Sequence, residues 1–165
     1  MQMKKLNVNA QASQEAEPER NVVTDRLVLT PREWNFIIKG NPNWNPHYSF
    51  SKGEVIIQEN GVYSIIGQIA SGVCSIEKQT ENGTIALGKI GEGEIFGEIQ
   101  FLTSKSASAS VIADSDVEMY IIDGDFVAGQ LFQTDPKIVI KFYHYLCVTI
   151  AKRINLRESE GWRRS

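Results

Sequence analysis

The stretch that decides the fold is GEGEIFGEIQFLTSKSASASV, residues 91–111. It combines three glycines and Glu98 with small hydroxylated residues, and it ends in a β-branched residue. Glycine lets the backbone approach a ligand closely, and N–H groups at the start of a helix bind anions. The stretch therefore predicts an anion-binding loop. Its run SKSASAS, however, holds Lys105 and no arginine, so the loop is either a working pocket or the remains of one.

Around this stretch, residues 50–123 show a β pattern. The turn signals Glu59-Asn60-Gly61 and Glu81-Asn82-Gly83 separate short runs of β-branched and apolar residues, the second as a hairpin. These runs are VII, YSIIGQIA, VCSIEK, TIALGKI, SASVIA and VEMYIID. Short strands divided by turns predict a sandwich or barrel, and no alternation of strand and helix suggests a parallel α/β sheet.

Helical signals flank the β region. Thr30-Pro31-Arg32-Glu33 predicts a helix start, with an end near Gly40. The following PNWNPHYSF is expected to be a loop. A second, longer helix is predicted to begin at Pro136 after a cap at Thr134 or Asp135, because apolar residues then recur every three or four positions. Lys152, Arg153 and Arg157 are expected at its end, where the helix dipole favours cations.

These signals predict one domain over residues 22–165, with a β-roll at about 50–123 and a C-terminal helical segment at about 125–158. Residues 1–21 are polar without periodicity, and we expect a disordered tail or linker. Trp34 and Trp44 are expected to pack the N-terminal helical segment on the roll, and Trp162 to lie at an exposed end. Cys74 is expected to be a small core residue.

The composition excludes several classes of function. The net charge of −3 argues against a broad nucleic-acid surface, and no apolar run is long enough for a membrane span. Two isolated cysteines and the lack of an apolar leader favour a cytoplasmic protein. His47 and His144 are the only histidines, too few for a metal site on a jelly-roll, and no catalytic triad is visible. His144 and Cys147 have helical ligand spacing, but packing is the preferred interpretation.

The order of motifs resembles the cyclic nucleotide-binding domain family. The matching segments are FSKGEVI at 50–56, ENG at 59–61, SGV at 71–73, GEGEIFGEI at 91–99 and ASVIA at 109–113. The resemblance implies a mostly β, jelly-roll-like double-stranded β-helix with a short N-terminal and a long C-terminal helix. It also implies a non-catalytic regulatory domain that needs no cofactor or metal, whose ligand is cGMP or cAMP and whose partner is a neighbouring effector.

The resemblance implies a ligand site as well. A glutamate at the position of Glu98 would bind the ribose 2′-hydroxyl, and backbone N–H groups from Gly97 onward would meet the phosphate. Ser108 falls where cGMP-preferring members often have threonine. The candidate ligand-binding residues are Ile76, Ile90, Gly97, Glu98, Ile99, Ala107, Ser108, Ala109 and Ser110. A tight turn at Gly97, a helix cap at Glu98 and plain core packing of the two isoleucines are the alternatives.

The match fails at one position, because the family's phosphate-binding arginine falls on Ala107. Losing two charge-assisted hydrogen bonds would cost about 3–6 kcal/mol, roughly a 100- to 10,000-fold loss in affinity. Glu98 would then repel an incoming anion with no arginine to offset it. Three hypotheses remain at this point: a weak cyclic-nucleotide sensor, an interaction module that binds no nucleotide, and a jelly-roll enzyme.

Overall fold

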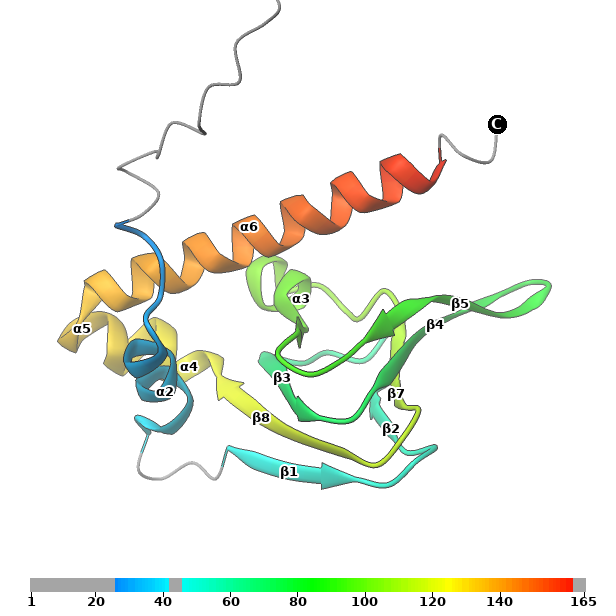
Figure 1. Ribbon diagram of the computed structural model, residues 1–165, viewed down its shortest axis with the longest axis horizontal. Helices are drawn as coiled ribbons and strands as arrows, with labels where there is room; N and C mark the ends of the chain where they lie inside the picture. Colours follow the sequence, from blue (N-terminus) through cyan, green and yellow to red (C-terminus); the bar gives the residue numbers. More distant parts are fainter. Residues whose placement is uncertain (1–25, 42–45, 162–165) are drawn as a thin grey trace, which may run out of the picture.

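The structure is a computed structural model that describes residues 26–41 and 46–161, with side-chain surroundings up to residue 154. The expected tail at 1–21, Trp44 and Trp162 lie outside the described residues. Two four-stranded antiparallel sheets form the roll, and helices gather at one side of it (Figure 1). One sheet has the order β1-β8-β3-β6 and the other β2-β7-β4-β5. The expected mostly β, roll-like architecture with flanking helices is confirmed.

The strands follow the turn signals closely. They are β1 (His47–Phe50), β2 (Val55–Ile57), β3 (Ile65–Ser71), β4 (Cys74–Thr80), β5 (Gly83–Ile90), β6 (Ile95–Phe96), β7 (Ser110–Ala113) and β8 (Val117–Asp123). The β4–β5 hairpin closes with Thr80 opposite Gly83, as its turn signal predicts. Asn60 has the positive φ of 64° that the turn after β2 requires.

The helices are α2 (Pro31–Lys39), α3 (Glu98–Thr103), α4 (Gly124–Phe126), a π-helical segment η1 (Val127–Leu131), α5 (Phe132–Thr134) and α6 (Pro136–Gly161). The helix start predicted at Thr30-Pro31 is confirmed and takes the form of a capping box, because Thr30 accepts from the Glu33 N–H and Glu33 accepts from the Thr30 N–H. Trp34 packs α2 on the roll as expected. Its indole donates to Gln68 on β3 at 2.8 Å, and its ring lies 5.0 Å from the Tyr145 ring.

Two apolar clusters make the core. One fills the roll, and Cys74 lies in it with no exposed surface, which confirms the prediction for that residue. The other joins the helices to the β1-β8-β3-β6 sheet, and Phe142 and Leu146 of α6 are fully buried in it. Ile154, later on the same helix, is 53% exposed. The first half of α6 is therefore anchored in the core, while its second half runs out beyond it (Figure 1).

Residues 124–134 form helical turns within the helical segment expected at about 125–158, and α6 begins at the expected Pro136. Two local expectations need correction. His47–Phe50 is an edge strand paired with β8, not a loop; its residues are mostly exposed, so no apolar pattern marks it. Lys152 and Arg153 do not lie at the end of α6, because no glycine or proline interrupts the chain until Gly161. The side chain of Arg157 lies outside the described residues.

Candidate functional site

A pocket of about 470 Å³ lies between the roll and the second half of α6. Its walls come from β4 and β5, from the segment that enters α3, from the residues before β7, and from α6. The volume is within the range of small-ligand pockets. The pocket is therefore bounded on one side by the sequence stretch that predicted an anion-binding loop and on the other by a helix far away in sequence.

Gly97 sets the geometry of this wall. Its φ is +84°, and a Cβ there would lie 2.5 Å from the Ile65 carbonyl oxygen, so both the backbone conformation and the available space call for glycine. The tight turn given above as an alternative to a ligand role at Gly97 is thus present, although Gly97 also lines the pocket. The turn makes Glu98 the first residue of α3 and places its side chain in the pocket wall, where only 4% of it is exposed.

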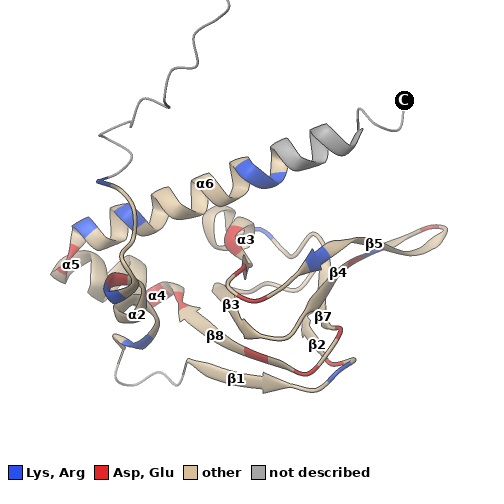
Figure 2. Ribbon diagram, viewed as in Figure 1, with Lys and Arg blue, Asp and Glu red and all other residues tan. Residues whose placement is uncertain are grey.

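Arg153 of α6 neutralises the Glu98 carboxylate. Its Nη1 donates to Glu98 Oε1, and its Nη2 donates to the backbone carbonyl of Ile95. Figure 2 shows the basic segment of α6 beside the acidic start of α3. The expectation that Glu98 would stand without an arginine is therefore wrong. The charge comes from a residue 55 positions away in sequence, well outside residues 91–111 (the cassette).

A weak signal for Arg153 exists in the sequence. Ile150 and Ile154, one turn before it and one residue after it, belong to the apolar repeat of the helix, and both line the pocket. A basic residue inside an apolar stripe is unusual for a solvated helix face. Lys78 on β4 is the other charged lining residue that the sequence analysis missed.

Six of the nine candidate ligand-binding residues line the pocket: Ile76, Gly97, Glu98, Ile99, Ser108 and Ala109. Ala107 is 1% exposed and does not line it; its N–H donates to the Gly61 carbonyl at 2.8 Å. Lys105, the only cation of the SKSASAS run, is exposed and also lies outside the lining.

Ser110 and Ile90 have structural partners instead. The Ser110 hydroxyl accepts the Glu59 N–H at 3.0 Å and so ties β7 to the turn after β2. Ile90 is 3% exposed and pairs with Cys74 across the β4–β5 hairpin. These two residues, together with Ala107, stabilise the roll that the pocket is built on.

The charged residues of the lining are Lys78, Arg153 and Glu98, two cations and one carboxylate. The remaining walls are mostly apolar, so the pocket suits a small ligand with an apolar body and a negative charge. Among the described residues, no group of three or more His, Cys, Asp or Glu side chains could hold a metal ion. No helix in the described part of the chain has the length and apolar character to cross a membrane.

Two solved structures share this fold. A cyclic nucleotide-binding domain from Methylobacillus flagellatus KT superposes with a TM-score of 0.68 at 20% identity, over 72% of this chain and 67% of that one. The catabolite activator protein of Thermus thermophilus superposes with a TM-score of 0.64 at 24% identity, over 80% of this chain and 58% of that one.

Two proteins with similar sequences are named as cyclic GMP-binding proteins. Cyclic GMP-binding protein C of Dictyostelium discoideum is 36% identical over 141 residues, which cover 80% of this chain and 5% of the relative. Cyclic GMP-binding protein D of the same organism is 32% identical over 92 residues, which cover 55% and 7%. The chain thus spans only a small part of these relatives. The sequence model of the cyclic nucleotide-binding domain family matches residues 48–134, more than half of the chain. The chain therefore belongs to the cyclic nucleotide-binding domain family.

Proposed function

We propose that this domain is a non-catalytic regulatory module that binds a purine 3′,5′-cyclic monophosphate, cGMP in preference to cAMP, with weak affinity. The observation that carries the proposal is the position of Glu98. The Gly97 turn holds its carboxylate in the wall of a 470 Å³ pocket, which Ile76 of β4 and the residues before β7 also line. A carboxylate accepts a ribose hydroxyl, and the apolar wall accepts a purine face.

Ser108 and the relatives support the preference for cGMP. The Ser108 hydroxyl lines the pocket and can serve a guanine as donor or acceptor. Two Dictyostelium relatives are named as cyclic GMP-binding proteins. Catalysis is not proposed, because the lining hydroxyl has no histidine near it among the lining residues. We place the domain in the cytoplasm, since Cys74 and Cys147 are free thiols.

Regulation would act through α6. Its first half is anchored by Phe142 and Leu146, while Ile150, Arg153 and Ile154 of its second half line the pocket. A ligand that contacts those residues binds one placement of this half of the helix better than another, and so shifts the population. A neighbouring effector domain attached beyond α6 would sense that shift.

A titration of the 165-residue chain with cGMP, cAMP and 5′-GMP tests the proposal. At about 100 times Kd, a ligand stabilises the fold by about 2.7 kcal/mol, which raises Tm by roughly 5–11 °C for a domain of this size. We expect saturable shifts with cGMP, smaller ones with cAMP, and none with 5′-GMP at the same concentration. No shift at about 1 mM of either cyclic nucleotide would contradict the proposal.

Amide hydrogen exchange tests the regulatory part separately. Addition of cGMP should change exchange in peptides from residues 147–161 more than in peptides from residues 137–146, because only the later half lines the pocket. Equal change along the whole helix would contradict a local effect of the ligand on α6.

An interaction module that binds no nucleotide is the second candidate. Its support is the cassette itself, where Ala107 is buried in the roll and Glu98 already has a partner. This alternative predicts no ligand-dependent change in either the titration or the exchange experiment.

A further inference from the structure

We infer that Arg153 of α6 binds the phosphate of the ligand and so replaces the arginine that the cassette lacks at Ala107. This inference rests on the proposed function, which it extends from a site to a specific contact. It starts from the observation that the Arg153 side chain lies in the pocket wall and is tied to Glu98 and Ile95.

The pair with Glu98 leaves capacity for a ligand. A guanidinium has five N–H donors, of which Arg153 uses one on each Nη atom for its two contacts. The remaining donors can meet a phosphate oxygen. Glu98 accepts through Oε1, which leaves Oε2 for a ribose hydroxyl. The two side chains can therefore bind adjacent ribose and phosphate groups without breaking their own contact.

The same pair removes the electrostatic objection to an anion in this pocket. Glu98 alone would repel a phosphate, but a paired Glu98 carries its counter-charge on the pocket side of α6. Because the Arg153 side chain is only 28% exposed, its attraction for an anion is less screened than that of a surface cation.

The other two cations fit this role less well. Lys105 is exposed and lies outside the lining. Lys78 lines the pocket, but from the exposed end of β4 near the hairpin rather than beside Glu98. It also lacks the planar fork that matches two phosphate oxygens. Arg153 is the lining cation held at the ribose-binding carboxylate.

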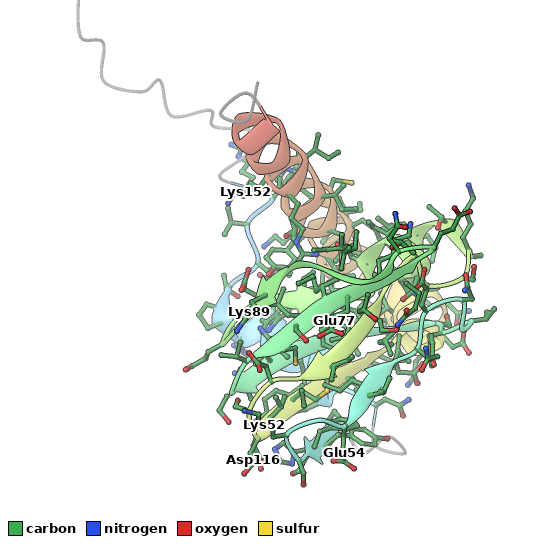
Figure 3. All side chains as sticks on the ribbon, turned by 90° about the vertical axis from the view of Figure 1, so that its right-hand side faces the viewer. Lys52, Glu54, Glu77, Lys89, Asp116 and Lys152 are labelled. Atoms are coloured by element: carbon green, nitrogen blue, oxygen red, sulfur yellow. The ribbon has the colours of Figure 1, made fainter. Side chains whose placement is uncertain are left out.

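The test compares cGMP with guanosine, which has the same base and ribose but no phosphate. Calorimetric Kd values are measured for the wild-type chain and for Arg153→Gln, Arg153→Lys, Lys78→Gln and Lys152→Gln. Lys152 is the matched control because it is exposed on the same helix. Figure 3 shows it apart from Lys89 and Glu77 of the roll. Circular dichroism at the assay temperature verifies that each variant is folded.

We expect Arg153→Gln to weaken cGMP binding by about 10- to 150-fold, the value of one hydrogen bond to a charged group. Guanosine binding should stay within about twofold of wild type. Arg153→Lys should lose part of the cGMP affinity because it keeps the charge but not the fork. Lys152→Gln should leave the cGMP affinity within about twofold of wild type, and Lys78→Gln, which removes a lining cation, should weaken it less than Arg153→Gln does.

Each other outcome has a definite meaning. If the wild-type chain binds neither compound, the proposed function itself fails. If it binds cGMP but Arg153→Gln binds as tightly as Lys152→Gln, or more tightly than wild type, the inference is overturned while the function stands. An equal loss for cGMP and guanosine, or the larger phosphate-specific loss in Lys78→Gln, also overturns it. Should Arg153→Gln fail to fold, the comparison of cGMP with guanosine in Arg153→Lys decides.

Discussion

The ion pair between Glu98 and Arg153 should be strongly asymmetric when either partner is removed. The Glu98 side chain is 4% exposed, whereas the Arg153 side chain is 28% exposed. Arg153→Met leaves a buried carboxylate without its counter-charge, while Glu98→Gln leaves a guanidinium that can turn toward water. Breaking a buried pair by removing one partner costs about 3–5 kcal/mol when the remaining charge cannot escape.

We expect Arg153→Met to lower the free energy of unfolding at neutral pH by about 3 kcal/mol, the lower end of that range, because Glu98 borders a pocket. Glu98→Gln should cost about 1 kcal/mol, since the amide oxygen still accepts from Arg153. The double variant should be about as stable as Glu98→Gln alone, which corresponds to a coupling free energy of about 3 kcal/mol.

Urea unfolding followed by circular dichroism measures these free energies, and thermal melts check them. For a domain of this size, about 3 kcal/mol corresponds to a Tm decrease of roughly 6–12 °C. Lys152→Met is the control for changing one cation on the same helix, and it should cost less than about 0.5 kcal/mol. Equal costs for Arg153→Met and Glu98→Gln, or an additive double variant, would refute the reasoning from burial.

Predictions elsewhere in the chain concern strain, thiols and pH. Gly97 and Gly83 both have positive φ, but of the two only at Gly97 would a Cβ meet a backbone oxygen. Gly97→Ala should therefore lower the free energy of unfolding in urea by more than the roughly 1–2 kcal/mol expected for Gly83→Ala. Equal decreases for the two variants would contradict this. At pH 8 a thiol reagent should modify exposed Cys147 in the folded chain, whereas Cys74 should react only in urea, because burial raises its pKa to about 11; early mass-spectrometric labelling of Cys74 would count against it. A hydrogen bond from Lys141 on α6 lowers the pKa of Glu33. The stabilisation of the fold by this pair is therefore fully present above the unfolded-state pKa near 4.5, and it is lost as the pH falls through the lower folded-state pKa. Glu33→Gln should thus lower Tm at pH 7, with a difference that shrinks below pH 4.5; a constant difference would disprove the linkage.

The parts of the fold that follow local rules could be predicted from the sequence. The start of α2 depends on a capping box within four residues, and the β4–β5 hairpin on a turn that includes Gly83. Each is decided by interactions between near neighbours in the chain. The edge strand His47–Phe50 was missed because its pairing with β8, some 70 residues away, decides its structure while its own side chains stay exposed.

The residues of the site also differ in whether local sequence predicts them. Glu98 and Gly97 were found because the cassette is one continuous stretch, and both line the pocket. Arg153 could not be predicted because it lies far from Ala107 and Glu98 in the sequence, and no local signal links it to them. Its role depends on where α6 crosses the roll, and that depends on the packing of Phe142 and the rest of the helical core.

A phosphate-binding cation on α6 instead of on the cassette would have a consequence for regulation. An arginine at the position of Ala107 would belong to the roll, and its backbone position would not depend on where α6 lies. Arg153 belongs to the helix, so any movement of the second half of α6 away from the roll removes the guanidinium from Glu98 and from the ligand together. On the proposed assignment, ligand binding and the placement of α6 are therefore linked through one side chain. The contact would contribute about 1.5–3 kcal/mol, which limits the coupling to roughly a 10- to 150-fold change in affinity between the two helix placements. A weak site of this kind can still be an effective switch, because differential affinity for the two placements, and not total affinity, sets the response.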